Sequence, residues 1–348
     1  MAKAKKLPSG NWRVQVFAGL DKDGKQIRKS FTAPTKKEAE FMAAEFKAKH
    51  KEIVRDKSAM TLSEGIDRYI EFKGGTLSPS TVRGYKMIQN KGLQSIMNIK
   101  MNKLTADLVQ AAINEEVGVK KQKTIKNEYS LVKAVVKMYA PNLSLAGVTL
   151  PQAEKFEAQE LTLQEVGILL NAIMKDEFSI GLLFAVCCGL RMSEITALKW
   201  ENYDSPQETI HIKKAVVRDV DNHYVTKSTK SKKSTRKIVV PKLLSKLLNN
   251  SYGDPEQHII TCSQNCLREH LTKICSQNGL PHLRMHDLRH INASVMAYLD
   301  IPTKYALERG GWEDIATMDK IYQFTFQDEK KAVDDKINHF FDKLVEGS

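Results

Sequence analysis

Alternating apolar and polar residues open the chain. The run WRVQV at 12–16 is followed by an Asp-Gly turn and a second alternating run that ends at residue 32. This pattern predicts a β-hairpin with a basic outer face. Helical periodicity follows over 34–55, with Thr35 as the N-cap. We therefore expect a small hairpin-plus-helix module over residues 1–57.

The next region has the period of helices throughout. One N-cap is placed at Thr61 or Ser63 and another at Thr105, and Pro79 stands early in a helix, where its missing N–H costs nothing. The pattern predicts an all-α domain over residues 58–150. A polar, Pro-containing stretch at 141–161 lacks periodicity and is expected to act as a linker.

Residues 151–348 are predicted to form a third domain of mixed character. Helices are expected at 162–174 and 178–188, β-rich segments at 209–240, and helices again toward the end. The expected fold class is multidomain α+β, with a β-hairpin/helix module, an all-α domain and a mainly α domain that carries a small antiparallel sheet.

The distribution of charge along the chain predicts the kind of partner that the protein binds. The net charge is +13, and residues 213–237 alone hold nine basic and two acidic side chains. Residues 1–58 and 59–150 are also strongly basic, which favours a polyanion such as nucleic acid as the partner. There is no apolar run long enough for a membrane span and no apolar stretch typical of a signal peptide, so we expect a cytoplasmic protein without membrane contact.

The segment HDLRH contains the most concentrated candidate chemistry. In a helix, His286, Arg289 and His290 fall on one side with small residues, and Leu288 and Ile291 fall on the other. A zinc pair, a structural cluster and a phosphate site all fit the two histidines. The guanidinium favours phosphate, because its planar fork matches two phosphate oxygens.

A second arginine follows a predicted helix end. Gly189 is expected to end one helix, Arg191 to occupy the break, and Ser193 to begin a new short helix. An arginine beside the apolar LLFAVCC run needs an anion. A salt bridge to Glu194 or Glu201 is the simpler explanation when the segment is considered alone.

Together, GLRMSEI, HDLRH and GGWEDIATMDKIY resemble the three signature segments of the tyrosine recombinase, or phage integrase, family. TKSKKSTRKIVVP resembles the lysine-bearing hairpin of that family. Residues 1–57 resemble the arm-type DNA-binding module of phage and conjugative-transposon integrases, and 58–150 resemble the helical (SAM-like) core-binding domain. Residues 151–348 would then be the catalytic domain with a C-terminal tail helix.

The resemblance implies a site-specific integrase that cuts and rejoins DNA through a 3′-phosphotyrosyl intermediate, without metal or ATP, to integrate and excise a mobile element or prophage. Two arginines would bind the scissile phosphate, a tyrosine would attack it, a histidine would relay the proton, a lysine would protonate the leaving oxygen, and a tryptophan would donate its indole N–H. These catalytic residues are Arg191, Arg289, Tyr322, His286, Lys230 and Trp312. Glu194 and His290 would support them.

Alternatives remain for the catalytic lysine and for the nucleophilic tyrosine. The register of the hairpin from Pro241 favours Lys230 as the catalytic lysine, and Lys227 in the same sequence context is the fallback. Tyr298 and Tyr305 compete with Tyr322 as nucleophile, but Tyr298 is expected in the core and Tyr305 precedes the signature. The expected DNA-binding residues are Arg13, Lys25, Arg28, Lys227, Lys232, Lys233 and Arg236.

No cofactor or metal is expected. The group Cys262, Cys266, His270 and Cys275 fits no standard zinc spacing and is expected to pack. The expected partners are double-stranded DNA, at core-type and arm-type sites, and a homotetramer assembled on it. A directionality factor and a host DNA-bending protein are further candidates.

The apolar stripe after Tyr322 predicts a short terminal helix that docks on its own domain or on a neighbouring protomer. Two other functions remain open: a type IB-like topoisomerase with the same chemistry, and a DNA-binding regulator without catalysis.

Overall fold

The structure is a computed structural model of the chain. It describes residues 4–20, 26–152, 161–228, 235–312 and 338, without the side chains of 17–20, 26–27, 47–58 and 228. The chain divides into two compact units, 1–154 and 155–348, and each is described by itself.

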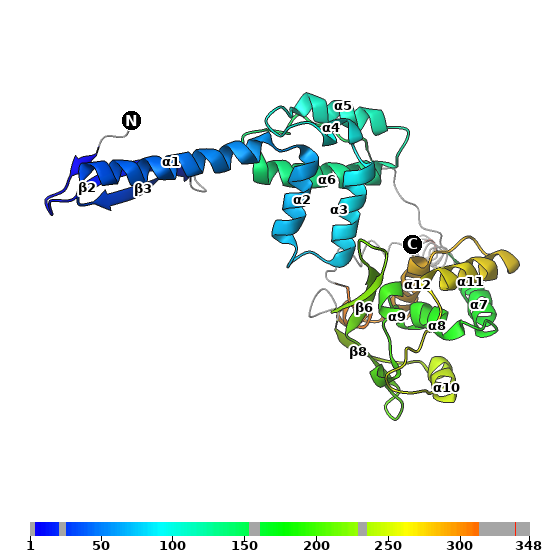
Figure 1. Ribbon diagram of the computed structural model, residues 1–348. Coiled ribbons are helices and arrows are strands. Elements are labelled where there is room, and N and C mark those ends of the chain that lie inside the picture. The colour runs from blue at the N-terminus through cyan, green and yellow to red at the C-terminus, as the bar shows by residue number, and fades with distance from the viewer. Residues whose placement is uncertain (1–3, 21–25, 153–160, 229–234, 313–337, 339–348) are drawn as a thin grey trace, which may run out of the picture. The chain divides into compact units, whose positions relative to one another are not determined.

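The first unit begins with the predicted hairpin and helix (Figure 1). Strands β1 (Lys5–Lys6), β2 (Trp12–Leu20) and β3 (Gln26–Ala33) form an antiparallel sheet in that order. Val14 and Val16 are buried against Ala39 and Ala43 of helix α1 (Lys36–Ala59). Thr35 caps this helix as predicted, because its hydroxyl accepts the N–H of Glu38.

The helical part of this unit surrounds its own apolar core. Thr61 forms a capping box with Glu64, and Ser78 precedes Pro79 at the first helical position, so the local signals in the sequence set both helix starts. Thr105 also caps a helix as predicted. The helices are α2 (Leu62–Lys73), α3 (Pro79–Lys91), α4 (Gln94–Met97), α5 (Ala106–Glu116) and α6 (Gln122–Tyr139).

The predicted linker does not begin at Pro141. Leu143, Leu145, Val148 and Leu150 pack against the core of the helical part, although they lie in irregular segments rather than in helices. Periodicity could not reveal this, because isolated apolar residues in an irregular segment have no period. Residues 153–160 lie outside the described part of the chain.

The second unit is built around α8, whose side chains are nearly all buried. Helix α12 packs along α8, and both belong to one apolar core. The helices named in the described part of this unit are α7 (Leu163–Met174), α8 (Ser179–Cys188), α9 (Met192–Ile195), the 3₁₀ helix η1 (Trp200–Asn202), α10 (Lys242–Asn250), α11 (Gln264–Gln277), α12 (Met285–Tyr298) and α13 (Thr303–Gly310).

Two small antiparallel sheets complete this unit, as the β-rich segments predicted (Figure 1). One has the order β4-β5-β8, and the other is the hairpin β6-β7. The strands are β4 (Tyr203–Asp204), β5 (Thr209–Ile212), β6 (Lys214–Arg218), β7 (Tyr224–Ser228) and β8 (Arg236–Val239). Among the helices that the structure describes, none is long and apolar enough to cross a membrane.

Candidate active site

Arg191 lies where the chain passes from α8 into α9. Gly189 ends α8 in the left-handed conformation (φ 65°), as predicted, and Arg191 is the N-cap of α9, which begins one residue earlier than expected. Its Nη1 contacts Glu194 Oε1 at 2.8 Å, which is the salt bridge that the sequence suggested, and its Nη2 donates to the carbonyl of Gly311 at 3.0 Å. The side chain is 35% exposed, so one part of it remains open to a ligand.

Arg289 of α12 is buried, with only 1% of the residue exposed. Its Nη1 donates to the carbonyl of Gly189, and its guanidinium lies 4.4 Å from the centre of the Trp312 ring. Nη2 is buried and has no hydrogen-bond partner within the described residues. A buried cationic donor without a partner is costly, so this geometry suits an anion placed at Nη2.

The charges around Arg289 add to this tendency. Burial first, and Arg191 and Arg236 after it, lower the pKa of Arg289 to about 9, while Glu194 acts in the opposite direction. The guanidinium is still protonated at neutral pH. Its charge is therefore held in a place where a negatively charged ligand would be strongly favoured.

His286 and His290 stack edge to face on α12, with their ring centres 4.5 Å apart. His286 keeps an exposed surface, yet desolvation first, followed by His290 and Arg289, lowers its pKa to about 4. Burial also lowers the pKa of His290. His286 is thus neutral at pH 7 and can accept a proton.

The small residues on the same side of α12 as Arg289 do not leave open space beside it. Ala293, Met296, Ala306 and Trp312 form a separate buried cluster, so α13 and the indole fill that side of α12. The Trp312 ring covers the guanidinium, an arrangement that a linear helical pattern cannot show.

Glu194 joins these residues to the sheet. It is 2% exposed and contacts both Arg191 and Arg236. Burial by itself would raise the pKa of Glu194, but Arg236 and then Arg191 outweigh burial and hold the pKa below its usual value. Glu194 is therefore a buried carboxylate shared by two guanidinium groups.

The expected role of Arg236 as a DNA phosphate contact is corrected by this placement. Its side chain is turned inward and its guanidinium is held by Glu194, so it is not on the surface that would meet DNA. A signal for this was present in the sequence: Arg236, Ile238 and Val240 alternate with exposed residues, which puts Arg236 on the core face of β8.

Other predicted residues lie at exposed positions or outside the described part. Arg13 and Arg28 are exposed on strands of the N-terminal hairpin, and Lys227 is partly buried on β7 opposite Ala215. Tyr298 was expected in the core, but it is 43% exposed because α12 ends at that residue and its last turn leaves the core. The predicted Lys25, Lys230, Lys232, Lys233, Tyr322 and tail helix lie outside the described residues.

The cysteine group does not assemble around His270. The Nδ1 of His270 pairs with Asp176 Oδ2 at 2.8 Å, and its ring lies edge-on to Phe178, so the imidazole links α11 to the start of α8. Cys275 is buried in the apolar core. These contacts are structural.

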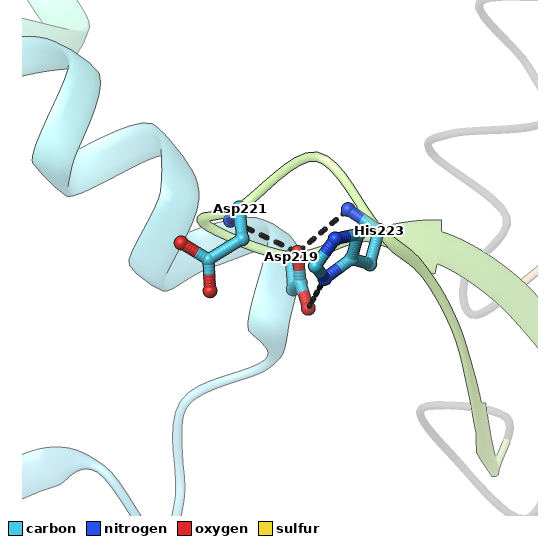
Figure 2. Close-up of side chains that lie close together, drawn as sticks. All are labelled: Asp219, Asp221 and His223. Atoms are coloured by element: carbon cyan, nitrogen blue, oxygen red, sulfur yellow. Dashed lines mark hydrogen bonds and ion pairs between the residues drawn. The ribbon is translucent and has the colours of Figure 1, made fainter.

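Asp219, Asp221 and His223 form the one close group of metal-ligating side chains found among the described residues (Figure 2). They lie in the turn between β6 and β7. Asp219 Oδ1 accepts the backbone N–H groups of Asp221 and His223, at 3.0 and 2.9 Å, which explains the cluster as a side-chain-stabilised turn.

Comparisons with known proteins identify relatives of this chain. Residues 159–328 match the model of the phage integrase family, and residues 61–117 match the N-terminal SAM-like domain of phage integrases. The ICEBs1 integrase of Bacillus subtilis is 22% identical, over 96% of this chain and 98% of the relative. The integrase of Staphylococcus phage L54a is 25% identical, over 85% and 98%.

Solved structures share the fold. The Tn1549 transposon integrase in complex with transposon right end DNA has a TM-score of 0.64 at 16% identity, over 80% of this chain and all of that one. A lambda integrase dimer bound to a core site has a TM-score of 0.58 at 14% identity, over 92% and 94%. With the family models matching both units, the chain belongs to the phage integrase family of tyrosine recombinases.

Proposed function

We propose that the protein is a site-specific DNA integrase that cuts and rejoins DNA to integrate, and in reverse to excise, a mobile element or prophage. The observation that carries this proposal is that Arg191 lies near the buried Arg289, whose Nη2 has no hydrogen-bond partner among the described residues. Two adjacent guanidiniums with an unsatisfied donor suit a phosphodiester, and the charge that develops in its pentavalent transition state more strongly still.

The reaction is divided among the site residues. Arg191 and Arg289 hold the scissile phosphate, and Tyr322 attacks it to form a 3′-phosphotyrosyl bond while the 5′ oxygen leaves. His286, neutral at pH 7, accepts or relays the proton of the nucleophile. Lys230, or Lys227 in its place, protonates the leaving oxygen. The covalent bond conserves the energy needed for rejoining, so ATP is not consumed.

Trp312 and the supporting residues organise this site. The indole shields Arg289 from water and orients its guanidinium. Each electrostatic contact between Arg289 and a phosphate is therefore stronger than it would be in water. Glu194 fixes Arg191 through both the guanidinium and the backbone N–H. His290 packs against His286 and sets its orientation.

DNA recognition is divided along the chain. Residues 1–57 bind arm-type sites, with Arg13, Lys25 and Arg28 as phosphate contacts, and 58–150 bind the core-type site. Lys227, Lys232 and Lys233 follow phosphates beside the catalytic domain, 151–348. Four protomers assemble on DNA in the cytoplasm of a bacterium, with the tail helix docked on a neighbour.

A type IB-like topoisomerase shares the chemistry and is the second candidate. The match of 61–117 to the SAM-like domain of phage integrases favours the integrase. Relaxation of supercoiled plasmid that carries no attachment site would instead favour the topoisomerase.

The decisive test uses a suicide DNA substrate that contains the core site, in buffer with EDTA. The wild-type chain should become covalently attached to DNA, and Tyr322→Phe should not. An adduct that persists in Tyr322→Phe, or one that requires Mg²⁺, would contradict the mechanism. DNA binding without any adduct would point to a regulator.

A further inference from the structure

Arg236 is a buried arginine that takes no part in the proposed phosphate contacts. It is the first residue of β8 and pairs with Ile212 of β5, and the alternation of the strand turns it to the core while Lys237 faces solvent. Its side chain is 3% exposed. A guanidinium is placed in such a position only when nearby acceptors compensate its desolvation.

The compensation comes from two elements of the active site. Nη2 contacts Glu194 Oε2 at 3.0 Å and Nη1 lies 3.3 Å from Oε1, so the carboxylate is held by both arms of the fork. Nε donates to the carbonyl of Arg309 at 3.0 Å, at the end of α13. β8 is thereby connected to α9 and to the segment that leads into Trp312.

The charge balance at Glu194 depends on this contact. Glu194 is the carboxylate that both Arg191 and Arg236 contact, and it also accepts the backbone N–H of Arg191. With Arg236 present, one negative charge is shared by two cations and a net positive charge remains at Arg191. Without Arg236, the buried carboxylate would neutralise Arg191 and compete with a phosphate for it.

The backbone contacts hold the glycine turn before Trp312. Arg191 Nη2 donates to the carbonyl of Gly311, two residues after the carbonyl that Arg236 binds. Gly311 has φ 63°, and a Cβ there would lie 2.9 Å from Arg236 Nη1, so the turn is fitted closely around this guanidinium. This turn positions the Trp312 indole against the face of the Arg289 guanidinium.

We propose that Arg236 is a positioning residue for DNA cleavage. It balances the charge of Glu194, so that Arg191 keeps its charge for the scissile phosphate, and it braces the 309–311 turn that holds Trp312 against Arg289. This inference rests on the proposed function, since it concerns the same phosphate site.

The test compares Arg236→Met, Arg236→Lys and the double variant Glu194→Gln/Arg236→Met in the full chain. The control is Lys237→Met, which removes one positive charge from the exposed face of the same strand. The single-turnover rate of adduct formation at saturating suicide substrate is measured beside the Kd for the same DNA and the Tm of each variant.

Arg236→Met should lower the adduct rate by about 10–100-fold, the range found when contacts that support metal ligands are lost, while the Kd changes less than about threefold. Arg236→Lys should fall between this variant and the wild type, and Lys237→Met should keep the wild-type rate. The double variant should be faster than Arg236→Met, because no uncompensated carboxylate then competes for Arg191.

A wild-type rate in Arg236→Met would overturn the inference. So would a double variant that is no faster than Arg236→Met, because charge balance would then not explain the loss. If Arg236→Met does not fold, Arg236→Lys takes its place, and a wild-type rate in Arg236→Lys overturns the inference. A wild-type chain that forms no adduct refutes the proposed function instead, and the two failures are therefore distinguishable.

Discussion

Arg289 is the most informative single residue, because its environment combines features that do not favour the stability of the fold. It is buried, stacked on Trp312 and surrounded by the like charges of Arg191 and Arg236. A side chain serving stability alone would have its donors satisfied, whereas Nη2 has no partner in the described part of the chain. The residue is thus arranged for a ligand that arrives from outside.

Replacement of Arg289 by Lys should slow adduct formation by about 100–1,000-fold, the usual loss when one donor to a transition-state oxygen is removed. Lysine keeps the charge but loses the planar fork and the stacking on Trp312. The matched control is Arg284→Lys at the start of the same helix, where the side chain is half exposed and paired with Asp287. Equal rates in the two variants would show that the fork at position 289 is not used.

Acidification should destabilise the fold through His286. Its folded pKa, about 4, lies below the usual value of 6.5, so the unfolded chain takes up the proton first. Stability is therefore full above about pH 6.5 and is lost as the pH falls toward 4. The lowered pKa values of His290, Glu194 and Asp287 act in the same direction.

The variant His286→Gln should lose less Tm than the wild type between pH 7 and pH 5, as measured by calorimetry. His223→Gln, at the exposed hairpin turn, provides the comparison. Identical losses in wild type and His286→Gln would remove His286 from this explanation.

At the scale of elements, the site residues are positioned mainly by the junction between α8 and α9 rather than by the helices themselves. Gly189 ends α8, its carbonyl accepts from Arg289, and Arg191 follows two residues later. Asn292 of α12 donates to the carbonyls of Val186 and Cys187 and so fastens this junction to α12. The two arginines therefore share one short backbone segment that fixes their separation.

Substitution of Gly189 by Ala should lower the Tm measurably. The left-handed conformation costs a non-glycine residue about 1–3 kcal/mol, and the new Cβ would also lie 2.7 Å from Asn292 Oδ1. At about 2–4 °C per kcal/mol for a unit of this size, we expect a loss of at least several degrees. Gly279→Ala is the control, since Gly279 has φ 66° but open space around its Cβ position. A loss no larger than that of Gly279→Ala would show that close approach to Asn292 does not matter.

At the scale of the whole molecule, positive charge is divided among regions with different tasks. The N-terminal hairpin presents Arg13 and Arg28 on exposed strand positions, next to polar Gln15 and Ser30, which hydrogen-bond each other. Under the proposed function, such a face would bind phosphates without adding to the catalytic site. Binding of arm-type DNA and cleavage of core-type DNA should therefore be separable.

The double variant Arg13→Ala/Arg28→Ala should weaken arm-type binding and leave the adduct rate on core-site DNA unchanged. Loss of two phosphate contacts should reduce the slope of log K against log salt by about 2. Arg268→Ala/Lys273→Ala, which removes the same charge from exposed positions of α11, should leave that slope unchanged. An equal reduction in both variants would mean that the effect is general electrostatics.

Much of this protein was determined by the sequence alone. Side chains at Thr35, Thr61 and Thr105 start helices because their hydroxyls satisfy nearby N–H groups, and Gly189 ends α8 because it accepts a positive φ. The signature segments identified the family for the same reason: local chemistry near a reacting phosphate restricts which residues can stand at each position.

Tertiary structure decided what depends on partners far along the chain. The inward turn of Arg236, the carbonyls of Gly189 and Gly311 as acceptors, and the Trp312 ring over Arg289 join residues separated by 23 to 120 positions. Strand register and helix packing fix these pairs, and no local period encodes them. The sequence by itself thus specified the elements and the family, whereas packing between distant segments decided which charges are shared and which buried donor is left without a partner among the described residues.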